Sequence, residues 1–252
     1  MSIHNSAFPD QPVDATPGST AFVPPDSPPQ TPRAYIPLER TRLEEETSPT
    51  PAAKKLEETL VGKAFVAKVS GDARIRSRHT TQWHRAALKE TLVAGDEIET
   101  GADGRIELVL GSGRVIQLKP NSQLAIQKLS ADPVTGARED LFEARIGKIR
   151  AAVEKHKASS KLEVKTPTAI AGISGTVMYL DITPSGTTAF FEGGEGYLNS
   201  LDGDSETVGD GQFAFADDQG SLSAPDETTD EQQEEFAGGW DPEEEVFGYS
   251  EP

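Results

Sequence analysis

The sequence predicts one all-β domain, a short-stranded sandwich or a β-helix-like stack, flanked by disordered tails. The main observation is an alternation of apolar and polar residues that begins at Gly62 and is interrupted by Gly, Asn, Asp or Pro every six to twelve residues. A proline-rich segment precedes this region and a strongly acidic segment follows it. We therefore expect a domain over residues 61–216, between tails formed by residues 1–60 and 217–252.

The N-terminal segment, residues 1–60, contains 11 of the 18 prolines of the chain. Few aliphatic residues separate them, so little apolar surface is available to offset the entropy lost on ordering. Pro49 and Pro51 interrupt the one stretch with spaced leucines, residues 38–60. We expect a disordered proline-rich linker without a Sec-type signal, because residues 1–18 have neither a basic start nor an apolar run.

The C-terminal segment is the source of the chain's acidity. The chain has 24 Lys and Arg against 42 Asp and Glu, which gives a formal net charge of -18. Residues 203–252 contain 16 of the acidic residues and no Lys or Arg. Since like charges repel one another, we expect residues 217–252 to be a disordered acidic tail. This net charge also disfavours binding to nucleic acid.

Twelve segments of the middle region have the alternation and length of strands. They are residues 62–70, 73–78, 97–100, 105–110, 114–118, 123–129, 141–153, 162–166, 176–182, 187–192, 196–201 and 212–216. The clearest hairpin joins 105–110 to 114–118, because Gly111-Ser-Gly113 favours a tight reversal between them. We expect Val115 to face the core if Gln117 faces solvent.

The motifs of common nucleotide-binding and hydrolytic enzymes are absent from the sequence. Gly62-Lys63 and Gly147-Lys148 are followed by Ala and Ile, where a phosphate-binding loop has Ser or Thr. Residues 172–175, Gly-Ile-Ser-Gly, lack one residue of the nucleophile elbow of serine hydrolases. The chain has no Cys, which excludes disulfides, thiolate metal sites and cysteine nucleophiles. We expect no enzymatic activity and no cofactor.

Two polar patterns resemble metal-binding motifs incompletely. His79 and His84 flank a tryptophan at a spacing that does not place both on one helical turn, so we interpret them as part of a surface loop that the tryptophan anchors. Asp202, Asp204 and Glu206 resemble the start of a calcium loop, but the glycine and glutamate that complete such a loop are missing. A weak calcium site there is an alternative to a glycine-rich turn.

Seven basic residues are concentrated between positions 145 and 165, and no Lys or Arg follows them. They are Arg145, Lys148, Arg150, Lys155, Lys157, Lys161 and Lys165. If their strands share one face, this basic face would bind a protein partner or an anionic surface polymer. Two alternatives are a half-exposed strand with no binding role and attraction of the chain's own acidic tail. Aromatic residues that would stack on bases are not interleaved, so we expect no nucleic acid partner.

Four aromatic residues occur near the end of the acidic segment: Phe236, Trp240, Phe247 and Tyr249. Aromatic side chains within a disordered segment commonly anchor it to a partner. We interpret these four as a linear docking motif or a C-terminal export signal, with chance composition as the alternative.

The segment from Trp83 to Ser122, with Gly95-Asp96 and Thr100-Gly101 in order, resembles the FecR-type domain. The downstream elements Gly147-Lys148-Ile149, Thr166-Pro167 and Gly175-Thr176 also fit, and the similarity covers residues 62–216. The resemblance implies an all-β domain of the kind found in the periplasmic part of the ferric-citrate signalling regulators. Those regulators have an anti-sigma segment and a membrane span before this domain. We identify neither here and expect a stand-alone domain.

The motif residues also have a structural explanation. Gly95-Asp96, Thr100-Gly101 and Gly175-Thr176 occur where strands turn sharply; glycine permits a positive φ, and Asp or Thr caps backbone amides. Gly147 belongs to the same set. Thr166-Pro167 begins a strand or a corner, where the missing proline donor does no harm. We expect these residues to shape the fold and not to catalyse a reaction.

These observations together predict a non-catalytic protein-interaction or scaffold module of the bacterial cell envelope or surface. Its partner would be another protein or a second copy of the chain, and an anionic surface polymer is a further candidate. The alternative is a regulatory signalling protein that contacts a transporter or a sigma-factor system. The family resemblance favours a location outside the cytoplasm, reached by a route other than Sec.

Overall fold

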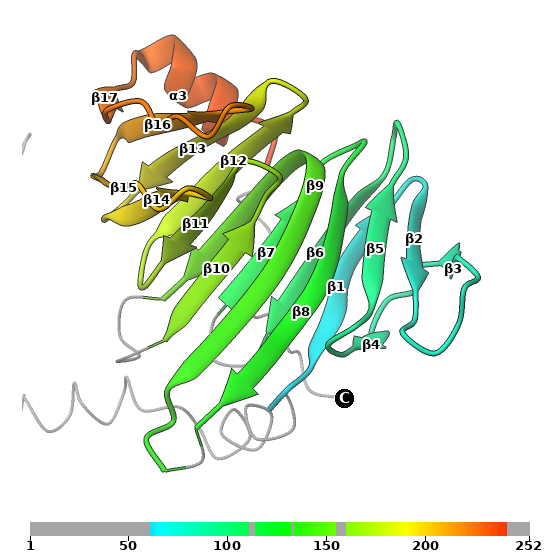
Figure 1. Ribbon diagram of the computed structural model, residues 1–252. Coiled ribbons are helices and arrows are strands. Elements are labelled where there is room, and N and C mark those ends of the chain that lie inside the picture. The colour runs from blue at the N-terminus through cyan, green and yellow to red at the C-terminus, as the bar shows by residue number, and fades with distance from the viewer. Residues whose placement is uncertain (1–60, 111–113, 133, 155–159, 241–252) are drawn as a thin grey trace, which may run out of the picture. The chain divides into compact units, whose positions relative to one another are not determined.

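The computed structural model describes residues 61–240, apart from residues 111–113, 133 and 155–159. These residues form seventeen strands and one helix (Figure 1). The elements are β1 (Ala64–Ser70), β2 (Ala73–Arg76), β3 (His84–Arg85), β4 (Thr91–Leu92), β5 (Glu97–Thr100), β6 (Arg105–Leu110), β7 (Arg114–Leu118), β8 (Gln123–Ala131), β9 (Arg138–Val153), β10 (Lys161–Lys165), β11 (Ala169–Ile173), β12 (Val177–Thr183), β13 (Gly186–Glu192), β14 (Gly196–Ser200), β15 (Ser205–Val208), β16 (Gln212–Asp217), β17 (Asp226–Glu227) and α3 (Asp230–Ala237). No helix in this part of the chain has the length and hydropathy of a membrane span.

Hydrogen bonds connect these strands into one continuous sheet, which is folded into two layers (Figure 1). The first layer, here called sheet I, has the order β4-β1-β6-β7-β9-β12-β13-β16-β17. The second layer, sheet II, has the order β3-β2-β5-β8-β9-β10-β11-β14-β15. All of these pairs are antiparallel except β9 with β10. The domain is therefore a β-sandwich.

The hydrophobic core lies between the two sheets. In sheet I, Ile106, Leu108 and Leu110 are buried along β6; in sheet II, Leu162 and Val164 are buried along β10. Successive side chains of a strand point to opposite faces, so the alternation seen in the sequence supplies one apolar face to each sheet. Each such side chain stabilises the fold by about 1.5–3 kcal/mol relative to an exposed one.

Strand β9 belongs to both sheets. Residues 138–146 pair with β8 and β10 in sheet II, and residues 147–153 pair with β7 and β12 in sheet I. Gly147 lies at the crossing with a φ of 103°, and a Cβ there would lie 2.2 Å from Oγ of Ser122. That same Oγ accepts the amide hydrogen of Lys148 at 3.1 Å. Only glycine meets both the conformational and the steric requirement at this position.

A buried ion pair bridges the two sheets. Arg114 begins β7 in sheet I, and Asp140 lies on β9 in sheet II. Their side chains, 2% and 1% exposed, are joined by a hydrogen bond from Nη1 to Oδ2. Loss of hydration outweighs the attraction of the arginine and raises the pKa of Asp140 above its ordinary value. Each partner therefore depends on the other to remain buried.

The all-β prediction is confirmed, and three predicted segments coincide with β5, β6 and β7. Strand β11 is absent from the predicted segments, because its sequence, Ala-Ile-Ala-Gly-Ile, contains few bulky residues of the kind that favour strands. The expectation for Val115 was wrong: Ile116 and Leu118 are buried, and Val115 shares the outer face with Gln117. The reversal at residues 111–113 lies outside the described residues.

The chain after β16 differs from the predicted disordered tail. Strand β17 pairs with β16, and α3 follows it. The helix begins with a capping box, in which Oγ1 of Thr229 accepts the amide hydrogen of Gln232 and the Gln232 side chain accepts that of Thr229. The aromatic side chains of this segment pack against apolar side chains on sheet I, and this packing offsets the repulsion between its acidic residues. Residues 241–252 and 1–60 lie outside the described residues.

Candidate interaction surfaces

The predicted basic face is divided between opposite sides of the sandwich. The outer face of sheet II carries Arg145, Lys161 and Lys165. The outer face of sheet I carries Lys148 and Arg150, which follow the crossing in β9. Lys155 and Lys157 lie outside the described residues. The described basic residues therefore do not form one surface, because β9 changes sheet between positions 145 and 148.

The two cations on sheet I have neighbours within this chain. Nζ of Lys148 lies 3.0 Å from Oδ2 of Asp181 and 3.6 Å from Oε1 of Glu235. The guanidinium of Arg150 lies 5.7 Å from the ring centroid of Tyr179. The contact with Glu235 agrees, for this one lysine, with the alternative that basic residues attract the chain's own acidic segment. Such a partly exposed pair contributes at most about 1 kcal/mol.

An aromatic cluster lies on the outer face of sheet I, apart from the main core. Tyr179, Phe190 and Phe213 project from β12, β13 and β16. Phe236 of α3 stacks on Phe190 with ring centroids 5.2 Å apart, and Trp240 lies 6.1 Å from Tyr179. Aromatic pairs of this kind add about 0.5–1.5 kcal/mol each beyond area burial. The segment 229–240, here called the C-terminal clasp, thus covers an aromatic patch of the sheet.

Two cations of the sheet hold the end of the clasp. Nζ of Lys119 donates to the carbonyl oxygen of Gly238 at 2.6 Å and lies 4.4 Å from the centroid of the Trp240 ring. Nη1 of Arg105 donates to the carbonyl oxygen of Gly239 at 2.8 Å. The last carbonyls of a helix and its dipole both favour cations here. Burial, and then the neighbouring cations, lower the pKa of Lys119 below its ordinary value.

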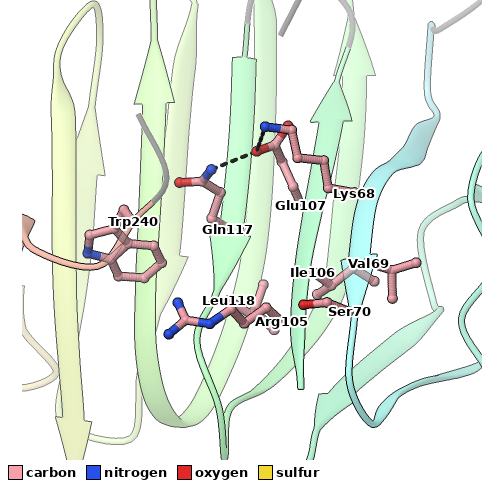
Figure 2. Close-up of a pocket in the computed structure, with 9 residues that line it drawn as sticks. All are labelled: Lys68, Val69, Ser70, Arg105, Ile106, Glu107, Gln117, Leu118 and Trp240. Atoms are coloured by element: carbon pink, nitrogen blue, oxygen red, sulfur yellow. Dashed lines mark hydrogen bonds and ion pairs between the residues drawn. The ribbon is translucent and has the colours of Figure 1, made fainter. Parts of the chain in front are cut away.

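A pocket of about 190 Å³ lies beside Trp240 on the outer face of sheet I. Figure 2 shows Trp240 on one side of it and Lys68 with Glu107 on the other. Glu107 is only 3% exposed; its Oε2 accepts a hydrogen bond from Nε2 of Gln117 at 2.6 Å and lies 4.0 Å from Nζ of Lys68. Its Oε1 is buried and has no hydrogen-bond partner among the described residues. Oε1 of Glu107 can therefore accept a hydrogen bond in this pocket, but no described residue donates one.

A second surface, the Trp83 groove, lies on the outer face of sheet II. It has a volume of about 220 Å³ and is lined by Arg76, Trp83, Glu97, Glu99, Gln123, Glu143 and Arg145, among others. The half-buried Trp83 ring lies 4.9 Å from the guanidinium carbon of Arg76. Nη2 of Arg76 in turn donates to Oε2 of Glu97 at 2.5 Å. The tryptophan is therefore held in place by a paired arginine at one end of an open polar groove.

A tyrosine cluster occupies another part of the sheet II face. The hydroxyl of Tyr197 donates to Oε1 of Glu163 at 2.6 Å, and Nζ of Lys161 lies 3.0 Å from the same oxygen. The ring crosses the intervening strand over Gly172, where a Cβ would lie 2.2 Å from the ring carbon Cζ. Burial, followed by the hydrogen bond to Glu163, raises the pKa of Tyr197 to about 12.

The motif residues at positions 95–101 lie at turns. Gly95 has a φ of 97°. The buried carboxylate of Asp96 accepts two backbone amide hydrogens, at 2.8 and 2.9 Å. Oγ1 of Thr100 donates to one backbone carbonyl at 2.7 Å and accepts a backbone amide at 2.9 Å. A Cβ on Gly101 would lie 2.9 Å from a carboxylate oxygen of Asp72. These contacts join neighbouring turns.

The motif residues at positions 166–176 make comparable contacts. Oγ1 of Thr166 accepts the amide hydrogen of Ala169 at 3.0 Å, and Pro167 lies in the bend between β10 and β11. Gly175 has a φ of 91°, and Oγ1 of Thr176 donates to the backbone carbonyl of Glu192 at 2.8 Å. Oγ1 of Thr166 also accepts a hydrogen bond from the hydroxyl of Thr187 at 2.8 Å. These contacts lie within the chain, as expected of residues that shape a fold.

The structure places the residues considered as metal ligands at separate, mostly exposed positions. Asp202 and Asp204 are exposed in the turn between β14 and β15, and Glu206 lies on β15. Nε2 of His84 instead lies 2.6 Å from Oε1 of Glu90. Within residues 61–240, as far as they are described, no group of three His, Asp or Glu side chains could hold a metal ion.

Sequence reasoning singled out Trp83 and Arg145 of the Trp83 groove and Trp240 of the pocket on sheet I, but it missed the other residues that line them. Glu107, Arg105 and Lys119 occupy ordinary polar positions of alternating strands, and nothing in the sequence indicates that the clasp reaches them. The one available signal was the pair of large aromatic residues Phe236 and Trp240 in an otherwise polar segment. Phe247 and Tyr249 lie outside the described residues.

Comparison with known proteins shows a similarity over the middle of the chain. Residues 96–194 match the family model described as FecR protein. Two crystal structures of a "putative anti-sigma factor" from Parabacteroides distasonis, at 1.65 and 2.50 Å resolution, are similar to this chain, with 12% identity, a TM-score of 0.46 and coverage of 57% of this chain. The match spans 65% and 64% of those chains, less than two thirds of their length. No curated protein matches the sequence. The part of the chain that is similar to the FecR protein family is thus residues 96–194, from just before β5 to just beyond β13.

Proposed function

We propose that this chain is a non-catalytic protein-interaction module and that its Trp83 groove contacts the partner. The observation that carries the proposal is a half-buried tryptophan, held by Arg76, beside a groove that the described chain leaves open. The corresponding face of sheet I is covered in part by the C-terminal clasp. Tryptophan and arginine are among the residues that contribute most to protein interfaces.

The groove has features suited to selective contact. Arg76 is already paired with Glu97, so less side-chain entropy is lost when a partner packs against Trp83. Glu99, Glu143 and Arg145 add charges of both signs along the groove. Charges at the rim of an interface select partners and set their orientation. We infer that the partner presents an apolar side chain to Trp83 and complementary charges beside it.

The chemistry of the groove supports a binding role over catalysis. Its described lining includes no Ser, Thr, Cys or His. Acyl transfer needs a nucleophile with a base within hydrogen-bond reach, and this lining supplies no such pair. The division of the basic residues between two faces also argues against an anionic surface polymer as the partner.

The partner could belong to either of two functional classes. A scaffold of the bacterial envelope or surface would use another structural protein or a second copy of this chain. A regulatory protein would use a transporter or a component of a sigma-factor system. The match of residues 96–194 to the FecR protein family supports the regulatory class. Neither class changes the surface that we propose.

The proposal is tested by co-purification from the source cells. Trp83→Ala should reduce recovery of the specific partner by tenfold or more, because loss of a central tryptophan typically costs about 2 kcal/mol or more. Lys165→Ala, on the same sheet but outside the groove, is the matched control and should recover the partner fully. Equal recovery by the two variants would refute the groove as the contact surface. The identity of the recovered protein separates the scaffold class from the regulatory class.

A further inference from the structure

The pocket beside Trp240 begins where the described chain ends. Trp240 is the last described residue, and its ring forms one wall of the pocket (Figure 2). The other walls come from β1, β6 and β7 of sheet I. Whatever follows Trp240 therefore starts at the edge of a pocket that contains a buried, unpartnered carboxylate oxygen.

We propose that residues 241–252 occupy this pocket and extend the C-terminal clasp across β7, β6 and β1. The distance to be crossed is short: neighbouring strands lie about 4.8 Å apart, so two strand spacings are about 10 Å. An extended chain advances about 3.3 Å per residue, so three or four residues suffice. The segment has twelve residues and therefore has length to spare.

Charge complementarity supports this occupant. Residues 241–252 contain five acidic residues and no Lys or Arg. The pocket is bordered by Lys68 and Arg105, and Lys119 lies beside Trp240. Opposite charges on a partly enclosed surface attract one another over about 8–10 Å at physiological ionic strength. An acidic segment tethered at Trp240 is thus held within reach of cations that attract it.

The buried carboxylate of Glu107 determines which part of the segment enters. Its Oε1 needs a hydrogen donor, because an unpartnered buried polar atom costs about 1–3 kcal/mol. It also repels acidic side chains. The uncharged run 246–250, Val-Phe-Gly-Tyr-Ser, can supply a backbone N–H or the Tyr249 hydroxyl while its aromatic rings lie near Trp240. The glutamates before and after this run would then lie towards Lys68 and Arg105.

This occupant would give the outer face of sheet I a role different from that of the Trp83 groove. The clasp and residues 241–252 together would cover β1, β6, β7, β12 and β13 from outside. The face of sheet II that contains the Trp83 groove would remain accessible. The inference does not depend on the proposed function, because it concerns contacts within one chain.

Disulfide trapping in the full-length chain tests the proposal, because the protein has no native cysteine. Ser250→Cys is combined with Ser70→Cys, which lines the pocket, or with Asp181→Cys on the other side of Trp240 on the same sheet. Under mild oxidation we expect the pair at 70 and 250 to close at least about tenfold faster than the control pair, because docking raises the effective concentration. Adding Lys68→Glu should slow closure at 70, and Lys68→Arg should not.

The products distinguish the possible occupants. A disulfide within one chain, selective for position 70, supports the proposal. A disulfide-linked dimer would overturn it in favour of a second copy in the pocket. Equal rates for the two pairs would also overturn it, since a segment without a docking site reaches both positions. Thermal denaturation of each reduced variant checks that the sandwich is folded.

Discussion

Tyr197 reaches Glu163 across a strand because residue 172 has no side chain. We predict that Gly172→Ala displaces the ring and destabilises the protein by about 1–3 kcal/mol, the usual range for overpacking. Urea denaturation measures this change. Tyr197→Phe, which keeps the ring and loses the hydroxyl, is the control and should cost less. A free energy of unfolding for Gly172→Ala equal to that of the wild type would show that the ring does not occupy this position.

The same tyrosine gives a prediction about pH. Its pKa of about 12 in the folded protein exceeds the ordinary value of 10.0. A group whose pKa is raised on folding stabilises the protein fully below its unfolded pKa and loses that contribution as the pH rises through the folded value. The wild type should therefore lose more stability than Tyr197→Phe between pH 10 and 12. Denaturation curves across this range, with tyrosinate absorbance, test it; parallel losses would contradict the assignment.

Residue-level contacts are where sequence reasoning was least successful. Asp96 and Thr100 could be recognised as turn residues, because glycines follow or precede them directly. The contact of Lys148 with Glu235 and the orphaned oxygen of Glu107 could not be predicted. Both depend on which strands are neighbours, and this is set by the crossing of β9 between sheets.

The strands β7 and β9 are linked by the buried pair Arg114 and Asp140. We predict that Asp140→Ala destabilises the domain by about 3–5 kcal/mol, because it leaves a buried guanidinium without its carboxylate. Replacing both residues together, Arg114→Met with Asp140→Leu, should recover most of the lost free energy of unfolding. Guanidinium denaturation of the three variants measures both effects. If the double variant is as unstable as Asp140→Ala, the ion pair stabilises the fold by more than keeping each buried charge neutralised.

The C-terminal clasp is an element that the sandwich does not need for its core. Phe236 and Trp240 belong to an aromatic cluster separate from the core between the sheets. We predict that Phe236→Ala with Trp240→Ala exposes the amides of α3 to hydrogen exchange and leaves those of β6 and β7 protected. Mass spectrometry of exchanged peptides resolves the two regions. Loss of protection throughout the sandwich would contradict this separation.

Strands with bulky alternating residues could be predicted more reliably than a strand of small residues or a helix in an acidic segment. Strands with bulky alternating residues, such as Arg105–Leu110, were predicted with their observed limits. β11 was missed because small residues weaken the pattern, and α3 was missed because charge was weighed above two aromatic side chains. Formation of α3 depends on the contact between Phe236 and Phe190, which is distant in sequence and therefore leaves no local pattern.

The whole molecule has two outer faces with different accessibility among the described residues. Sheet I carries its own chain over an aromatic patch, and sheet II presents the Trp83 groove. The sequence predicted the fold class and the FecR resemblance, because both depend on patterns within single strands. The sequence could not predict this asymmetry, because Arg145 and Lys148 are only three positions apart and yet lie on the outer faces of different sheets.

Site-specific photo-cross-linking in the source cells tests the central claim most directly. A photoreactive residue replaces Gln123 inside the groove or, as the control, Lys165 outside it on the same sheet. We predict one discrete cross-linked species from position 123, abolished when Trp83→Ala is added, and none of the same mass from position 165. The same species from both positions, or one from position 123 that persists without Trp83, would contradict the claim that the Trp83 groove binds the partner.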